Sequence, residues 1–100
     1  MPSVMIGPDE HVILTYSVPK SRLVEFEIDA DHPVKSYILG PKTLAKFSKG
    51  SNDFRYYGGF PDPRENQRQT VRIPFSGSWH LVIMNPSKRQ SVNVDYEVLY

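Results

Sequence analysis

The chain contains no cysteine. It therefore forms no disulfide framework, no thiolate metal site and no cysteine nucleophile, and such a chain fits a reducing compartment. It also lacks an apolar run long enough for a membrane-spanning helix, and its first 20 residues lack the basic start and apolar core of a signal peptide. These absences lead us to expect a cytoplasmic protein with no membrane partner.

The chain also lacks a strong excess of either positive or negative charge. Twelve Lys and Arg residues face eleven Asp and Glu residues, which gives a net charge of +1. A protein that binds nucleic acid mainly through phosphates carries a stronger basic bias, so we do not expect a nucleic-acid partner. The apolar content of 39% is sufficient for a folded core, and 100 residues fit a single domain over residues 1–100.

The strongest positive signal is the alternation of apolar and polar residues that is typical of β-strands. It is clearest at residues 92–100, and the almost wholly apolar run at residues 79–84 indicates a strand covered on both faces. Five further segments have strand character: 12–16, 24–28, 34–39, 53–59 and 71–75. Together they predict an all-β, antiparallel β-sandwich of about seven or eight strands.

Turn residues punctuate these segments. Ser76-Gly77-Ser78 predicts a hairpin, while residues 29–33 and 85–88 predict turns. The polar, proline-containing stretch Phe60–Gln69 predicts an exposed loop. Pro74, late in a strand pattern, predicts an edge or a bulge.

The segment from Pro41 to Gly50 predicts one short helix near residues 42–49. Leu44 and Phe47 are three residues apart, with the lysines of the segment roughly opposite them. Proline near the start and glycine at the end are the usual punctuation of a helix. Two or three helical turns need a sheet to dock on, so we expect the helix to lie against the sandwich.

The inward positions of the strand patterns predict the core, which comprises Val24, Phe26, Ile28, Val71, Ile73, Phe75, Trp79, Leu81, Ile83, Val92, Val94 and Tyr96. The last strand pattern runs to Tyr100. It therefore predicts a free sheet edge, through which two copies pair as a homodimer.

No constellation of residues indicates catalysis. Ser78 and His80 share one strand face without a nucleophile elbow, so a polar turn and the outward side of a strand explain them. Asp29, Asp31 and His32 lack the glycine and distal glutamate of a calcium loop, and carboxylates that cap a turn explain them better. Gly58-Gly59 is no phosphate loop, and a tight turn or bulge with positive φ accounts for it better than the approach of a ligand. We expect no enzyme, no cofactor and no metal.

Two surface features favour binding. Three lysines and an arginine lie within residues 42–55, and two tyrosines follow them, a combination that binds an anion or single-stranded nucleic acid when it is functional. A solvated helix face explains the lysines equally well. The second feature is the predicted loop at residues 60–69. Long loops on sandwich domains often bind a partner, but they also occur as tolerated insertions without a binding role. The candidate binding residues are Lys42, Lys46, Lys49, Arg55, Tyr56, Tyr57, Arg64 and Arg68.

Three motifs follow one another in the second half of the chain: Phe54-Arg55-Tyr56-Tyr57-Gly58-Gly59, Val71-Arg72-Ile73-Pro74-Phe75 and Gly77-Ser78-Trp79-His80-Leu81-Val82-Ile83. In order and position they resemble a bacterial family of uncharacterised small β-sandwich domains. Some members of that family are fused to TIR domains, so the resemblance implies an accessory or sensing role beside a fused effector domain. The resemblance covers residues 54–83 well and residues 22–50 only loosely, and the chain departs from it at residues 60–69 and 84–86.

The terminal pattern is similar to a second group, the sandwich accessory domains that follow secreted peptidases or occur in cargo receptors. Trp79, Leu81 and Ile83 alternate with other residues, and the same alternation returns at residues 92–98. This likeness concerns the fold alone.

The sequence therefore predicts a non-catalytic binding or accessory module for protein–protein interaction or sensing, whose partner is another protein or a fused effector domain. The alternative is a small-ligand or carbohydrate-binding sandwich. In that alternative Tyr37, Tyr56 and Tyr57 are the stacking platforms.

Overall fold

A computed structural model describes residues 2–50 and 55–100, and within them the chain forms six strands and one helix. The elements are β1 (Ser3–Ile6), β2 (His11–Val18), β3 (Arg22–Leu39), α1 (Pro41–Ser48), β4 (Gly58–Ile73), β5 (Gly77–Met84) and β6 (Val92–Leu99). The predicted all-β fold with one short helix is confirmed. Fewer strands form than we expected, because β3 and β4 each continue through a predicted break. The strand predicted at residues 53–59 begins only at Gly58, and residues 53 and 54 lie outside the described residues.

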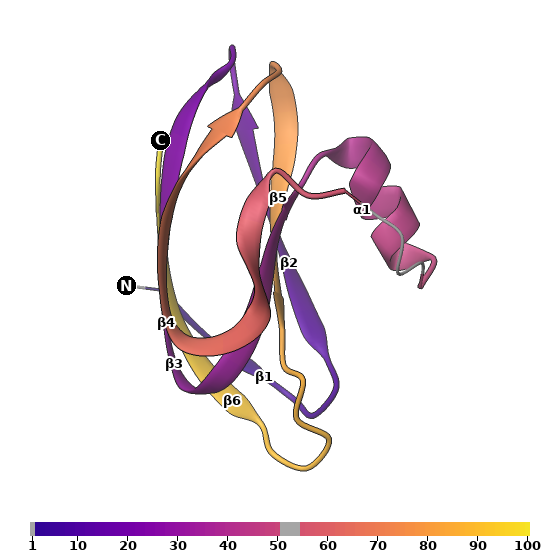
Figure 1. Ribbon diagram of the computed structural model, residues 1–100, viewed down its shortest axis with the longest axis vertical. Helices are drawn as coiled ribbons and strands as arrows, with labels where there is room; N and C mark the ends of the chain where they lie inside the picture. Colours follow the sequence, from indigo (N-terminus) through magenta and orange to yellow (C-terminus); the bar gives the residue numbers. More distant parts are fainter. Residues whose placement is uncertain (1, 51–54) are drawn as a thin grey trace.

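The strands form one antiparallel sheet that curls into a sandwich (Figure 1). Their order is β1-β6-β3-β5-β2, and β4 pairs with β3 along most of its length. Residues 25–30 of β3 pair with β6, whereas residues 35–39 pair with β5. The first layer therefore contains β1, β6 and the start of β3, and the second layer contains β2, β5 and the end of β3.

The bend of β3 between the layers shows why the predicted turn at residues 29–33 is wrong. The register of β3 with β4 shifts between Asp29 and Val34, so the chain passes through an irregularity and continues as strand. Such a position accepts Pro33, which has no N–H to donate. The buried side chain of Gln67 bonds across the bend: its Nε2 donates to the Val34 oxygen at 2.8 Å, and its Oε1 accepts from Ser36. Buried polar groups at the bend are thereby paired.

The loop predicted at residues 60–69 is also wrong, because these residues belong to β4. In the described part of the chain β4 pairs with β3 alone, so it is an edge strand, and Pro61 and Pro63 are tolerated there. Pro74, predicted to lie late in a strand at an edge or a bulge, instead follows the last residue of this edge strand. Near the start of β4, Gly59 has φ of +119°, and a Cβ there would lie 2.3 Å from the Ser36 carbonyl oxygen. The predicted positive φ is confirmed.

The chain crosses between the layers twice where the sequence indicated local turns. Ser76-Gly77-Ser78 is not a hairpin, because β4 lies beside β3 while β5 lies between β3 and β2. The loop after β5 does contain the predicted turn: Asn85 Oδ1 accepts from the Ser87 N–H at 3.0 Å, and Asn85 Nδ2 donates to the Ile6 oxygen at 3.1 Å. β6 lies between β1 and β3, but β1 pairs only with Val92–Asp95, so in the described residues the free edge predicted at the last strand is confined to the end of β6.

The core fills the space between the layers. All the predicted core residues are buried except Phe75 and Tyr96, which are partly buried against the core. Trp79 is fully buried and stacks on Tyr16 with ring centroids 4.9 Å apart. The sequence did not single out Ile6, which also belongs to this core.

The helix α1 lies outside the second layer, at the right of Figure 1, and contacts β5 and β3. Phe47 of α1 meets His11 of β2 edge to face, with centroids 5.0 Å apart. On the outer side of this layer Leu39, Val82 and His80 are buried, which confirms the prediction that the strand at residues 79–84 is covered on both faces. In residues 2–50 and 55–100 no helix has the length and apolarity needed to cross a membrane.

Candidate binding cleft

The start of α1 is fixed by a few local bonds. The Gly40 N–H donates to Thr43 Oγ1 at 2.9 Å, and the Thr43 hydroxyl donates to the Gly40 oxygen at 3.0 Å. Pro41 occupies the first helical position, where its fixed φ suits the helix and its missing N–H costs nothing. These bonds and the fixed φ of Pro41 therefore hold the first turn of α1 in one conformation.

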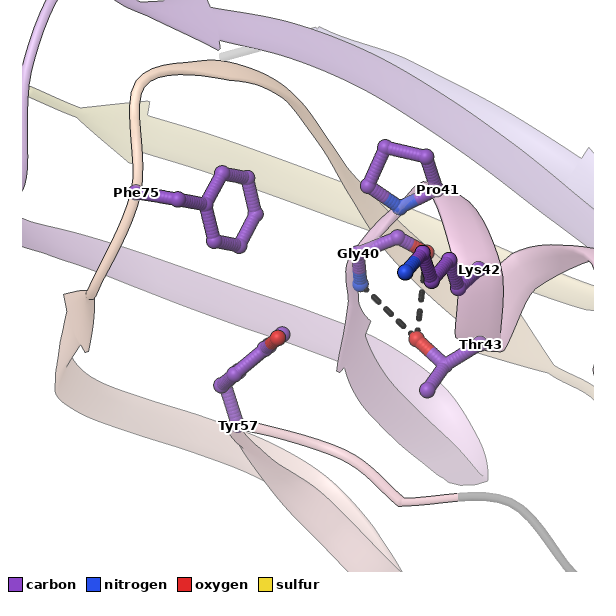
Figure 2. Close-up of a pocket in the computed structure, with 6 residues that line it drawn as sticks. All are labelled: Gly40, Pro41, Lys42, Thr43, Tyr57 and Phe75. Carbon is purple, nitrogen blue, oxygen red and sulfur yellow. Dashed lines mark hydrogen bonds between the residues drawn. The ribbon is translucent and has the colours of Figure 1, made fainter.

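An open cleft of about 270 Å³ lies beside the first turn of α1 (Figure 2). It is lined by Gly40, Pro41, Lys42, Thr43, Tyr57 and Phe75, so most of its surface is apolar. The rings of Tyr57 and Phe75 have centroids 5.6 Å apart and are tilted by 58°. The absence of a side chain at Gly40 leaves space beside both rings, because a Cβ would lie 3.2 Å from Tyr57 Cε2. Aromatic side chains are enriched at protein interfaces and commonly line ligand pockets.

A second aromatic pair lies next to the cleft in the sequence. Tyr56 meets Tyr37 of β3 with centroids 5.3 Å apart, and Tyr56 and Tyr57 are each 45% exposed. Burial, followed by the neighbouring Tyr56 and Asp62, raises the pKa of Tyr37 above its ordinary value of 10.0. Its hydroxyl therefore stays neutral at physiological pH and serves as a hydrogen-bond donor or acceptor.

The structure brings together part of the predicted binding set. Lys42 and Tyr57 line the cleft, and Tyr56 is the residue before Tyr57. Lys46 on α1 and Lys49 just after it are exposed but do not line the cleft, and Arg55 is exposed at the start of the second described range.

Arg64 and Arg68 do not join the cleft. The guanidinium of Arg64 lies 5.1 Å from the centre of the Phe60 ring, near the bend of β4. Arg68 lies in the part of β4 that pairs with the first layer, and its Nε donates to Glu25 Oε1 at 2.9 Å. The predicted recognition loop is therefore part of a strand, in which Arg64 and Arg68 already have partners.

Four cleft residues were missed by the sequence interpretation. Phe75 was assigned to the core, and no site role was given to Gly40, Pro41 or Thr43. The signal in the sequence is the helix start at Gly40-Pro41, which indicates a helix but not the aromatic rings that the fold places beside it.

His80 is hydrogen-bonded to a neighbouring strand. Its Nδ1 lies 3.0 Å from Thr15 Oγ1 of the neighbouring strand, and burial lowers its pKa below the ordinary value of 6.5. The partner of this imidazole is therefore a threonine hydroxyl rather than Ser78. In the parts of the chain that the structure describes, no group of three or more His, Cys, Asp or Glu residues has an arrangement that could hold a metal ion.

The fold is shared with known small β-domains. One similar structure is the pre-peptidase C-terminal domain of a collagenase from Bacillus anthracis, with a TM-score of 0.61 and 8% identity over 96% of this chain and 88% of that one. Another is a structure titled "CBM4 structure and function", with a TM-score of 0.51 and 8% identity over 96% of this chain and 80% of that one. No protein-family model and no curated protein sequence matches the chain. These likenesses define the class of fold, and the first agrees with the likeness expected from the terminal strand pattern.

Proposed function

We propose that this domain is a non-catalytic binding module that recognises a protein partner through the cleft beside α1. The observation that carries the proposal is the open recess between the rings of Tyr57 and Phe75 and the helix start at Pro41. Exposed apolar surface of this kind costs free energy in water, and a partner that covers it recovers that free energy.

The size of the cleft favours a polypeptide partner. About 270 Å³ is slightly below the range of about 300–1,000 Å³ that is usual for pockets enclosing whole small ligands. The cleft suits one ring or one branched side chain, which is how a protein interface uses an anchoring residue. Lys42 at the rim and the two further lysines of the helical segment favour acidic residues on either side of that anchor.

The resemblance to domains fused to TIR domains supports an accessory or sensing role, in which the partner is an effector domain of the same polypeptide or a separate protein. The likeness to a domain that accompanies a collagenase supports the same role, because that domain also accompanies a larger protein. Both likenesses favour binding rather than catalysis.

Affinity capture from source-cell lysate, read by mass spectrometry, tests the proposal with matched variants. Tyr57→Ala removes a wall of the cleft, whereas Tyr56→Ala removes an equally exposed ring that does not line it. We expect a protein that is enriched by the wild type and by Tyr56→Ala and is lost with Tyr57→Ala. A partner retained by both variants would move the site elsewhere.

A second candidate function is carbohydrate binding. It is favoured by the two aromatic pairs at one edge of the second layer, since sugars stack on ring faces beside polar side chains. The likeness to the CBM4 structure supports it. A glycan panel followed by tyrosine fluorescence separates the two functions: a glycan that binds the wild type but not Tyr57→Ala favours this candidate over a protein partner.

A further inference from the structure

The outward side of the first layer gathers acidic side chains from two neighbouring strands. The acidic face comprises Glu25, Glu27, Asp29, Asp95 and Glu97. The alternating residues of the same strands, such as Phe26, Ile28 and Val94, are buried in the core, so these carboxylates point away from it. Glu25, Glu27 and Glu97 also line one shallow pit together with Leu99, which places them on a common surface.

The register of this sheet sets like charges directly opposite one another. Glu27 is paired with Glu97, and Asp29 with Asp95. Like charges at directly opposed positions destabilise a sheet. Two cations of β4, Arg68 and Arg72, are in register with Glu27 and Leu23 on this side of the sheet, so they are fewer than the five carboxylates.

Few of these carboxylates have partners within the described residues. Arg68 is in register with Glu27, but its side chain bonds to Glu25. Asp95 accepts a hydrogen bond from the Ser3 hydroxyl. In the described ranges Glu27, Asp29 and Glu97 have neither a side-chain hydrogen bond nor an ion pair, so their charges remain available to another molecule.

The acidic face also carries apolar side chains. Leu23 of β3 and Leu99 of β6 point to the same side of the sheet and are 54% and 55% exposed. Carboxylates interspersed with exposed leucines favour a protein partner over a small cation, because a cation gains nothing from the leucines.

The complementary charges lie on the other side of the same molecule. Lys42, Lys46 and Lys49 are exposed and spaced four and three residues apart, so they form a lysine stripe along α1. The stripe spans roughly 10 Å at a helical rise of about 1.5 Å per residue. The row from Glu25 to Asp29 spans roughly 13 Å at a strand rise of about 3.3 Å per residue. The two rows therefore match in length as well as in sign.

We propose that the acidic face of one copy docks against the lysine stripe of a second copy. Because α1 lies outside the second layer and the acidic face lies outside the first, one molecule cannot make this contact with itself (Figure 1). The contact is heterologous, so a pair of copies retains one unused acidic face and one unused lysine stripe, and the association can propagate. This inference goes beyond the proposed function, since it does not need the aromatic wall of the cleft or Tyr57, although both proposals use the lysines of the helical segment.

Sedimentation velocity on the full chain tests the contact over a concentration range up to about 1 mM. Surface charge pairs are individually weak and are screened by salt, so we expect association at low salt that weakens at least tenfold between about 50 and 500 mM salt. Two neutralised proteins probe the two surfaces: Lys46→Gln/Lys49→Gln leaves the cleft residue Lys42 in place, and Glu27→Gln/Glu97→Gln alters the acidic face. Each protein alone should sediment as a monomer.

Mixing the two variants gives the decisive result. The helix variant keeps an intact acidic face and the sheet variant keeps an intact lysine stripe, so an equimolar mixture should form a one-to-one complex that cannot extend. The double variant Lys88→Gln/Arg89→Gln, with the same charge change on exposed residues after β5, should associate like the wild type.

Three results would overturn the proposal: a wild type that remains monomeric at the highest concentration, association that survives in both variants, or a mixture that does not re-form a complex. A monomeric wild type that binds a lysine-rich peptide through Glu27 and Glu97 would assign the acidic face to a different, basic partner. Binding of the proposed partner in the cleft is measured separately with Tyr57→Ala, so either proposal can fail without the other.

Discussion

The rings of Tyr57 and Phe75 lie with their centroids 5.6 Å apart, and both are within van der Waals reach of the place where a side chain at Gly40 would project. These three residues come from three different connections of the fold: the end of β3, the segment before β4 and the crossing after β4. The cleft therefore exists only when the two long strands and α1 are in place. Its accessibility depends on residue 40 having no side chain.

Gly40→Ala should weaken partner binding through the cleft while it leaves the fold intact. The new Cβ would lie 3.2 Å from Tyr57 Cε2, and the exposed Tyr57 ring can shift by the few tenths of an ångström that this contact needs. The backbone at Gly40, with φ of −86°, accepts alanine. We expect about tenfold weaker binding, equivalent to about 1.4 kcal/mol, and a loss of at most about 1 kcal/mol of stability from the poorer helix cap. Isothermal titration calorimetry and urea unfolding measure the two effects, with Ser48→Ala on the exposed side of α1 as the control.

The environment of His80 predicts a pH dependence of stability. Burial lowers the pKa of His80 in the folded state, whereas the unfolded chain titrates near the ordinary value of 6.5. As the pH falls through about 6.5, His80 binds a proton in the unfolded state but not yet in the folded state. The free energy of unfolding therefore declines until the pH reaches the lower pKa that His80 has in the folded state. His80→Gln keeps a polar group near Thr15 and removes this titration. Urea unfolding between about pH 7.5 and 5.5 should show a smaller loss for His80→Gln than for the wild type, and equal losses would contradict the assignment.

The sequence predicted the regular strands well, because their burial alternates residue by residue. Residues 92–99 and the doubly covered β5 are examples, and Trp79, Leu81 and Ile83 were correctly placed in the core. The helix after Gly40 was also predicted, from proline at its start and glycine after its end.

The two long strands were not predicted, for a physical reason. Residues 60–66 of β4 are mostly exposed and contain two prolines, so they resemble a loop locally. They become a strand because β3 offers a pairing partner far away in the sequence and because an edge strand tolerates proline. The pairing at the bend depends on Gln67, whose partners Val34 and Ser36 are over thirty residues away. A local sequence pattern cannot indicate partners that are so distant in the sequence. For the same reason it could not indicate that Tyr57 and Phe75 would lie together in the cleft.

Trp79→Ala should cost about 3–5 kcal/mol of stability, because the indole is fully buried between the layers and its removal leaves a cavity. Its Nε1 has no hydrogen-bond partner in the described residues, so Trp79 contributes through packing against Tyr16 and its other neighbours. Trp79→Phe, which retains a ring, should cost less than half as much. Urea unfolding followed by circular dichroism measures both variants, and a loss below about 1 kcal/mol for Trp79→Ala would show that the core is assigned wrongly.

Glu97→Gln should stabilise the isolated domain although it weakens self-association. Glu97 lies directly opposite Glu27 in the β3–β6 pair, and neutralising one of two opposed carboxylates removes a repulsion worth about 0.2–1 kcal/mol. The midpoint of urea unfolding at low salt and low protein concentration should therefore rise, and about 500 mM salt should shrink the gain because salt screens the repulsion. Asp95→Asn is the matched comparison: it relieves the opposed pair with Asp29 but keeps an oxygen that accepts from Ser3. If neither variant gains stability at low salt, the opposed carboxylates do not destabilise the sheet, and no partner is needed to compensate them.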